Sequence, residues 1–251
     1  MKLQYLIICG ILSNTLIFSV MEIKCQTAYA TDSTENNNLK VELNTELVSQ
    51  YIWRGQLFDY HPQIQPQIQL TTGNFIFGIW GSQSLLTSDA EIDFYASYSY
   101  RSITLSIYDY FYFDESNLGE SRFFNYRNYD SIVSNHTLDA CLLFDKIGGT
   151  NFSLTASCFF LGDDHNSNRV RQFSNYLNLD YSFSYQEMDL ILSAGGTLSN
   201  GFYAENAAIT TLSLKAIRTI PINKNTGIDL SGTFTFNPNQ ETLFFTFGIK
   251  I

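Results

Sequence analysis

Residues 39–54 read LKVELNTELVSQYIWR, and this stretch decides the fold class. Apolar, hydroxyl and aromatic side chains occupy the odd positions from Leu39 to Trp53, whereas the even positions are charged or amide apart from Val48 and Ile52. Successive side chains of a strand point to opposite faces, so a period of two residues predicts a β-strand with one apolar and one polar face.

The same period continues along the rest of the chain. Residues 63–70 place glutamine at every odd position, with Ile64, Pro66, Ile68 and Leu70 between them. Further alternating runs begin near Phe75, Glu91, Ile103, Ile132, Asn151, Phe173, Met188, Ala207, Gly227 and Thr242. We therefore expect about twelve strands of roughly 10 to 13 residues and no helix of useful length. Soluble strands average about 5 to 6 residues, whereas a strand needs about 9 to 11 to cross a membrane.

The connections between these runs alternate in length. The longer ones span 55–62, 83–90, 114–131, 162–172, 198–206 and 237–241. The shorter ones lie near residues 72–73, 101–102, 147–149, 185–186 and 223–226. Short turns at one end and longer loops at the other are typical of outer-membrane barrels. The sequence therefore predicts an all-β fold, a transmembrane antiparallel up-and-down β-barrel over residues 39–251, with both termini on the periplasmic side.

The first residues predict export. The apolar run from Leu6 to Val20 is shorter than the roughly 20 residues of a spanning helix, and Ala28-Tyr29-Ala30 fits a signal-peptidase site. We expect residues 1–30 to be a signal peptide that is removed and residues 31–38 to be a short periplasmic segment; an uncleaved anchor helix is the less favoured alternative. The apolar last strand suits recognition by barrel-assembly machinery. The expected location is the bacterial outer membrane, and the expected partners are outer-membrane lipid and that machinery.

Composition narrows the possible partners further. The 251 residues carry 14 Lys+Arg against 24 Asp+Glu, for a formal charge of −10. An acidic chain argues against a nucleic-acid partner, because phosphate needs a basic surface. Only 15% of the residues are charged and 16% are aromatic, which is unusual for soluble domains, where about 25% are charged. No nucleotide, phosphate-loop or zinc motif occurs, so we expect no cofactor and no bound metal.

Four short motifs resemble a known family. Residues 49–55 (SQYIWRG) and 62–66 (PQIQP) resemble the opening of the TorF-like porin family, and residues 78–82 (GIWGS) and 91–95 (EIDFY) continue the likeness in the same order. The resemblance covers roughly residues 45–113. It implies an outer-membrane β-barrel with pore activity.

If the apolar faces meet lipid, the polar faces line the interior. The expected pore-lining residues are Glu42, Glu46, Arg54, Gln63, Gln65, Gln67, Gln69, Trp80, Glu91, Asp93, Arg101, Asp139, Asp180, Asp189, Asp229 and Lys250. Carboxylates outnumber basic groups on these faces, which favours cations in a water-filled passage. The alternative is that the charges pair and fill the lumen, because twelve strands lie between filled and open barrels in width. The glutamines could bind a sugar, although packing against neighbouring strands is favoured.

Local irregularities remain in this pattern. Pro66 has no edge strand to host it, so a bulge is expected there. Asp109 faces lipid unless a bulge after Ile107 turns it inward. Cys141 and Cys158 fall on opposite faces of one hairpin, so we expect two free thiols rather than a disulfide.

The leading functional prediction is passive diffusion of small polar solutes or ions with a mild cation preference. The alternative is a plugged barrel that serves as a structural, receptor or adhesion element through its loops; loop 114–131 could fold into the mouth or contact a partner. A lipid hydrolase centred on His136 is disfavoured. The nearby Ser134 is roughly 6.6–6.8 Å away by strand rise, whereas a nucleophile and its base must come within about 3 Å. We expect no enzyme activity.

Overall fold

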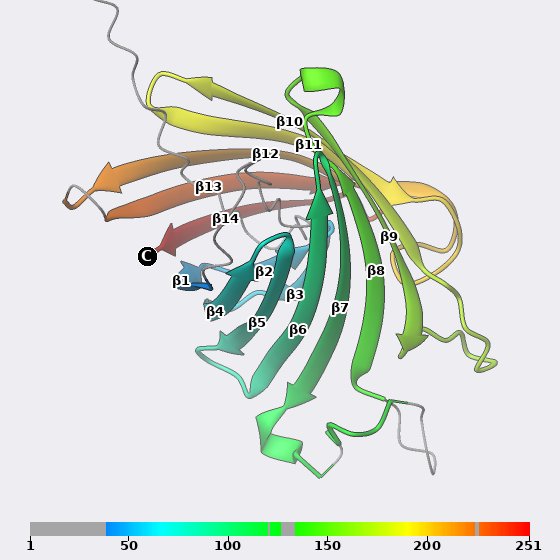
Figure 1. Ribbon diagram of the computed structural model, residues 1–251. Coiled ribbons are helices and arrows are strands. Elements are labelled where there is room, and N and C mark those ends of the chain that lie inside the picture. Colours follow the sequence, from blue (N-terminus) through cyan, green and yellow to red (C-terminus); the bar gives the residue numbers. More distant parts are fainter. Residues whose placement is uncertain (1–38, 120, 127–133, 224–225) are drawn as a thin grey trace, which may run out of the picture.

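The computed structural model describes residues 39–119, 121–126, 134–223 and 226–251. Within these ranges one antiparallel sheet closes into a barrel (Figure 1). Its strands are β1 (Lys40–Val48), β4 (Gln63–Thr72), β5 (Phe75–Ser84), β6 (Asp89–Tyr100), β7 (Ile103–Asp114), β8 (His136–Phe144), β9 (Phe152–Gly162), β10 (Asn175–Tyr185), β11 (Met188–Thr197), β12 (Ala208–Pro221), β13 (Gly227–Asn237) and β14 (Thr242–Lys250). The predicted all-β, antiparallel up-and-down barrel of about twelve strands is confirmed.

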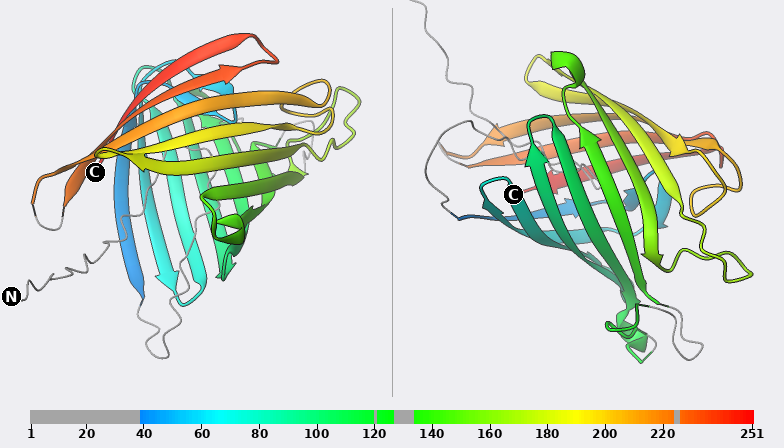
Figure 2. Two further views of the ribbon diagram at one scale, coloured as in Figure 1. Left: turned by 90° about the horizontal axis from the view of Figure 1, so that it is seen from above. Right: turned by 45° about the vertical axis from the view of Figure 1, so that its right-hand side comes forward.

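Consecutive barrel strands are neighbours, and β1 closes the ring by pairing with both β4 and β14. Short turns join the strands at one end, which we call the short-turn end; one of these turns contains the 3-10 helix η3 (Ile147–Gly149). Longer connections lie at the opposite, long-loop end, and one of them contains η1 (Glu115–Asn117). The carboxyl end of β14 lies at the short-turn end, with the β10–β11 and β12–β13 turns (Figure 2).

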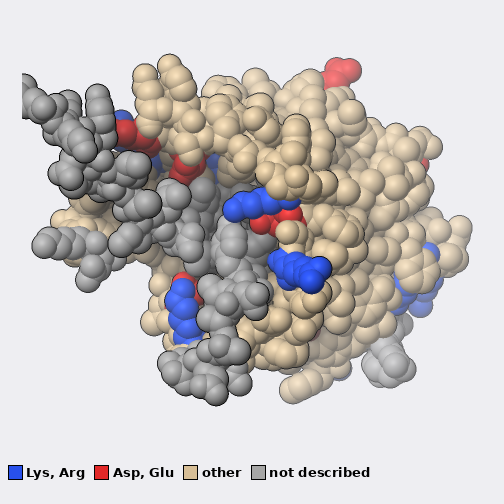
Figure 3. All heavy atoms as spheres, turned by 45° about the horizontal axis from the view of Figure 1, so that its top comes forward, with Lys and Arg blue, Asp and Glu red and all other residues tan. Residues whose placement is uncertain are grey.

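Burial alternates along the strands as the sequence predicts. On β4 the glutamines are buried, whereas Ile64, Ile68 and Leu70 between them are exposed on the outside. On the face shown in Figure 3 most of the surface is uncharged, and several Lys, Arg, Asp and Glu side chains lie toward the middle of the view. Soluble monomers rarely expose an apolar surface of this extent. Closure of the sheet also leaves no edge strand with unpaired backbone groups. The closed barrel with its apolar outer wall suggests a membrane protein.

The first alternating run does not continue to Arg54, which corrects the sequence-based prediction. β1 ends at Val48, opposite Gly248 of β14. The chain then leaves the wall and forms a second, two-stranded sheet of β2 (Tyr51–Trp53) and β3 (Gln56–Asp59). We call residues 49–62 the inner hairpin; its turn points into the barrel, where residues 51–54 are buried. Gln50 remains at the wall, where its side-chain amide donates to the carbonyl of Phe245, 3.0 Å away.

Neither of the two expected bulges forms. At Pro66 the pairing of β4 with β5 is interrupted without a change of register. Gly81 stands in that gap, where an added Cβ would lie 3.9 Å from the proline ring; the wall therefore tolerates the missing N–H without inserting a residue. Between β6 and β7 the register is continuous from Asp89↔Asp114 to Tyr100↔Ile103. Asp109 therefore stays on the outer face.

The cysteines are free, as predicted. Cys141 is buried and pairs with Ser157, whereas Cys158 pairs with Ala140. Adjacent positions on one strand point to opposite faces, so the two thiols are separated by the wall.

Some predictions fall on residues outside the described ranges. These are the signal peptide (1–30), the segment 31–38 and part of the loop 114–131. No helix in the described ranges is long and apolar enough to span a membrane.

Candidate functional site

The turn of the inner hairpin is anchored on β12 and β13, which lie close to β1 in the barrel. Its turn places Arg54 at φ 49° and Gly55 at φ 77°, the pair of positive φ values that a tight two-residue hairpin turn requires. The side chain of Thr210 on β12 donates to the carbonyl of Arg54 (3.2 Å), and Asn237 at the end of β13 donates to the carbonyl of Gly55 (2.9 Å). A Cβ at position 55 would lie 1.9 Å from the Thr210 carbonyl oxygen. Glycine is therefore needed both for the turn and for this close approach.

The Arg54 side chain forms a buried ion pair with the opposite side of the barrel. Its Nη2 lies 2.7 Å from Oδ2 of Asp139 on β8, and the two side chains are only 3% and 0% exposed. Its Nη1 donates to the hydroxyl of Tyr203, in the β11–β12 connection. The hydroxyl of Tyr110 donates to the same Asp139 oxygen at 3.3 Å. Burial raises the pKa of Tyr203 well above its ordinary value, so this phenol stays neutral.

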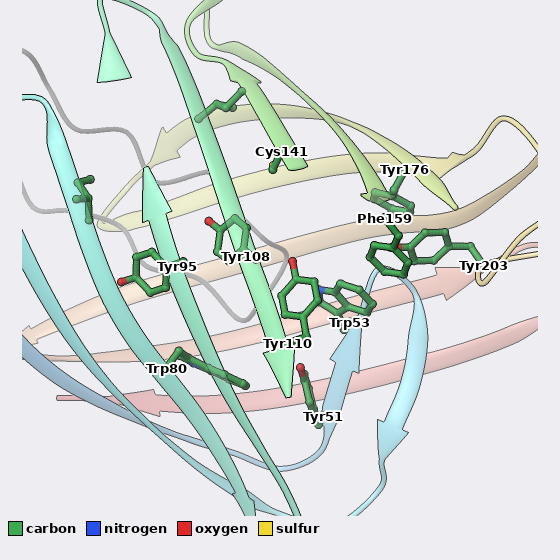
Figure 4. Close-up of a cluster of buried hydrophobic side chains, with 12 residues drawn as sticks. Tyr51, Trp53, Trp80, Tyr95, Tyr108, Tyr110, Cys141, Phe159, Tyr176 and Tyr203 are labelled. Atoms are coloured by element: carbon green, nitrogen blue, oxygen red, sulfur yellow. The ribbon is translucent and has the colours of Figure 1, made fainter. Parts of the chain in front are cut away.

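Aromatic rings surround the guanidinium. The Arg54 Cζ lies 4.5 Å from the ring centroid of Trp53, 5.0 Å from Tyr176, 5.5 Å from Tyr203 and 5.9 Å from Phe159. These distances are within the range of cation–π attraction. The four rings come from the hairpin, β9, β10 and the β11–β12 connection, and they gather in the interior (Figure 4). We call Asp139 together with the rings of Trp53, Phe159, Tyr176 and Tyr203 the cation cage.

Further rings pack the hairpin against the β5–β9 side of the lumen. Tyr51 contacts Trp80, with ring centroids 5.9 Å apart, and Trp53 contacts Tyr110 at 5.4 Å. We call this side the aromatic wall; its inward rings are Trp80, Tyr95, Tyr108, Tyr110 and Phe159. The hairpin and the aromatic wall together constrict the lumen near the long-loop end.

The other side of the lumen is lined by small polar side chains. We call it the hydroxyl wall; its inward residues on β11–β14 are Ser193, Ser213, Ser231, Thr233, Thr235 and Thr246. The side-chain oxygens of Ser231 and Thr233 are buried without a hydrogen bond from any described residue. Buried hydroxyls usually find a partner, so this wall is suited to a polar occupant of the lumen.

The glutamine ladder is paired within the wall. Gln63 Nε2 donates to Asp59 at 2.6 Å and Gln65 to Ser82 at 3.3 Å. Gln67 donates to the Tyr95 hydroxyl (2.7 Å), which in turn donates to Gln69 (3.2 Å). These contacts with β5, β6 and the hairpin favour the packing interpretation over a sugar site.

Asp59 ties the end of the hairpin to β4. Burial by itself would raise the pKa of this carboxyl, but hydrogen bonds from the His61 backbone and from the side chains of Ser84, His61 and Gln63 lower it below its usual value.

Most of the other predicted pore-lining residues also point inward, in two groups. Glu91 and Asp93 are buried on β6 beside the hairpin, and neither forms an ion pair with a described Lys or Arg. The second group lies towards the short-turn end. There the register aligns Glu46 with Lys250 and Lys250 with Asp229, and the remaining members are Glu42, Asp180 and Asp189.

Arg101 is not in this interior, which corrects its predicted position. It lies in the two-residue turn between β6 and β7 with φ 55° and is exposed, its guanidinium 5.3 Å from the Tyr100 ring centroid. Arg54 does face the lumen, although from the hairpin rather than from a wall strand.

Asp109 is shielded on the outer face by the folded part of the β7–β8 connection. His136 Nδ1 lies 2.8 Å from Asp109 Oδ1, and the Tyr126 hydroxyl donates to Oδ2 at 2.9 Å. The other ring nitrogen of His136 faces the carbonyl of Phe123, and Ser134 Oγ accepts from the His136 backbone at 3.1 Å. The described part of loop 114–131 therefore packs on the outside rather than in the mouth. The two ring nitrogens of His136 thus face the Asp109 carboxylate of β7 and the Phe123 carbonyl of the loop.

Sequence reasoning missed the four rings of the cage, Trp53, Phe159, Tyr176 and Tyr203, and placed Trp53 on the apolar face of the first strand. Nothing in the local alternation distinguishes these rings from lipid-facing aromatics. A signal for the hairpin did exist, because Val48 and Ile52 break the alternation just before Gly55. Among the described residues no cluster of three or more His, Cys, Asp or Glu is placed to bind a metal ion.

Comparison with known proteins does not assign a family. No protein-family model matches the sequence, and no curated protein matches it. One solved structure, described as "Unveiling the Mechanism Behind the in-meso Crystallization of Membrane Proteins", has a TM-score of 0.46 and 9% identity, over 83% of this chain and 82% of that chain. A likeness this weak assigns neither a family nor a function.

Proposed function

We propose that this chain is a porin-like barrel of the bacterial outer membrane, related to the TorF-like porins, through which small polar solutes or ions diffuse. The observation that carries the proposal is the inversion of the usual pattern: the outer wall is apolar, and the closed interior is lined by hydroxyl, amide and carboxylate groups. The inner hairpin makes the passage narrow. Solutes follow the hydroxyl wall, because the aromatic wall is occupied by the hairpin.

The lumen prefers cations. Eight inward carboxylates, Glu42, Glu46, Glu91, Asp93, Asp139, Asp180, Asp189 and Asp229, stand against the inward cations Lys40, Arg54, Lys215 and Lys250. Fixed negative charge along a narrow passage attracts cations and repels anions. Arg54 is already paired with Asp139, which leaves the rest of the lining net acidic.

The test is single-channel recording of the refolded protein in a planar bilayer under a potassium chloride gradient. We expect small, stable conductance steps and a reversal potential biased toward the cation. Substituting Glu91 and Asp93 together by glutamine and asparagine reduces that bias, whereas Glu187→Gln, an exposed residue outside the barrel strands, leaves it unchanged. Absence of steps from protein with the gel mobility of a folded barrel rules out the conducting passage.

A second candidate is favoured by the hairpin itself. Its turn is anchored to β12 and β13 and its arginine to β8, so both the hydroxyl side and the aromatic side of the lumen hold it. A barrel held shut in this way would act through its outer loops as a structural, receptor or adhesion element. Silent wild-type protein together with conducting hairpin variants would support this candidate.

We propose no enzyme activity. Lipid hydrolysis that is lost in His136→Ala would overturn this part of the proposal.

A further inference from the structure

The barrel holds the Arg54 guanidinium in the way that a binding site holds a cationic ligand. A guanidinium sits against one carboxylate and among four rings at 4.5 to 5.9 Å. Three of those rings, Phe159, Tyr176 and Tyr203, belong to the barrel and not to the hairpin. The barrel therefore supplies most of a binding site for a cation, and the hairpin supplies the cation.

We propose that the cation cage is a binding site for a planar or quaternary organic cation, of the guanidinium or alkylammonium class, and that Arg54 occupies it as a tethered substitute. This inference rests on the proposed function, because it names the class of solute that is retained in the passage. Such a solute competes with Arg54 and releases the hairpin turn from β8.

The chemistry of the cage favours this class over a simple metal ion. Aromatic faces attract cations whose charge is spread over apolar or weakly hydrated surface, whereas small inorganic ions prefer several oxygen ligands. Only one oxygen of Asp139 contacts Arg54; its Oδ1 is buried without a hydrogen bond from any described residue. A free guanidinium can approach both oxygens in the bidentate manner that a carboxylate accepts.

The backbone at Arg54 allows the substitute to be removed cleanly. At φ 49° a glycine is at least as comfortable as arginine, so Arg54→Gly empties the cage without straining the turn. Arg101→Gly is the matched control. That arginine also has a positive φ of 55° and lies near a tyrosine ring, but it is exposed and has no carboxylate partner in the described structure.

The experiment is a thermal-unfolding titration of detergent-refolded Arg54→Gly with methylguanidinium chloride, with urea and sodium chloride at equal concentration as controls. Urea has nearly the same shape without the charge. We expect methylguanidinium to raise the transition temperature of Arg54→Gly, with no comparable rise from urea or salt and none in Arg101→Gly. Adding Asp139→Asn is expected to weaken the affinity at least about tenfold, because a carboxylate partner is lost.

If urea raises the transition temperature of Arg54→Gly as much as methylguanidinium does, or if methylguanidinium raises that of Arg101→Gly equally, the proposed binding site is overturned. If Arg54→Gly does not refold alone, the same comparison is made on refolding yield, and failure of methylguanidinium to restore folding above the urea control overturns it as well. Binding is read without any measurement of flux, so a failed cage leaves the conductance result untouched, and a silent barrel leaves the binding result untouched.

Discussion

The two sides of the lumen are built from different side chains although both belong to one sheet. The aromatic wall fills its half with rings that pack on the inner hairpin, and its strands also carry the buried carboxylates Glu91, Asp93 and Asp139, each of which has an oxygen that no described residue bonds. The hydroxyl wall has short side chains and keeps buried oxygens that no described residue bonds. The same strand alternation therefore builds one half from large rings, which position the hairpin, and another half from short polar side chains.

The largest effect is expected from breaking the ion pair that holds the hairpin to the aromatic side. Asp139→Asn leaves the Arg54 guanidinium buried without a counter-charge, and such a loss costs about 3–5 kcal/mol. Urea unfolding in detergent, followed by gel mobility, measures the free energy of unfolding.

Asp189→Asn is the control, because this inward carboxylate lies near the short-turn end, where it accepts a hydrogen bond from the Ser184 hydroxyl. A loss as small as that of the control would mean that the hairpin does not depend on the pair. The double variant Arg54→Met with Asp139→Leu is expected to recover most of the stability, since an apolar replacement avoids burying charge.

The next effect concerns the contact between the hairpin turn and the hydroxyl side. Gly55 and Gly149 have nearly equal φ values of 77° and 78°, but a Cβ at Gly55 meets the Thr210 carbonyl at 1.9 Å, whereas at Gly149 nothing lies within 4 Å. Alanine at either position has the backbone cost of roughly 1 kcal/mol. We expect Gly55→Ala to lose about 1–3 kcal/mol more than Gly149→Ala, measured by the same unfolding assay. Equal losses would show that the turn does not press on β12.

These comparisons show which features the sequence carries. Strand positions, loop asymmetry and the inward face were predictable because each depends on a two-residue period that a single segment reveals. The inner hairpin was missed, because residues 49–54 keep that period apart from Ile52 after the chain leaves the wall, and the two breaks at Val48 and Ile52 are too slight to mark the end of a strand. The cage was also out of reach, since it joins Arg54 to rings more than 100 residues away, and local alternation contains no information about such long-range contacts. The outward position of Asp109 is explained by its contacts with His136 and with Tyr126 of the folded loop, and strand periodicity does not predict how a loop folds.

A smaller effect is expected on conductance when the hydroxyl wall is filled. Thr233→Trp places a ring on the polar side of the passage, so we expect the single-channel conductance to fall by about twofold or more. Phe234→Trp is the control, because the next residue on β13 points outward and is exposed. Trp80→Ala, on the aromatic wall, is expected to leave conductance unchanged or higher. If Trp80→Ala lowers the conductance and Thr233→Trp does not, the passage does not follow the hydroxyl wall.

The smallest effect is a pH dependence at the base of the hairpin. The pKa of Asp59 is lowered in the folded protein, relative to about 3.9 for an unperturbed aspartate. A carboxyl with a depressed pKa stabilises the fold above the unfolded pKa, and that contribution is lost as the pH falls through the folded value. We therefore expect the contribution of Asp59 to the free energy of unfolding to be constant above about pH 5 and to decline below about pH 4.

Asp59→Asn should remove this part of the acid sensitivity, because an amide does not titrate. Asp114 is the control: it also accepts hydrogen bonds, from Ser88 and Ser116, but it lies at the end of β7 on the long-loop side and away from the hairpin. If hairpin release, read from Trp53 fluorescence, follows Asp114→Asn and not Asp59→Asn, the bond between Asp59 and Gln63 does not hold the hairpin. If hairpin release follows Asp59→Asn alone, the hairpin is held at two places, by the Arg54–Asp139 pair in the cage and by the bond from Gln63, the first residue of β4, to Asp59.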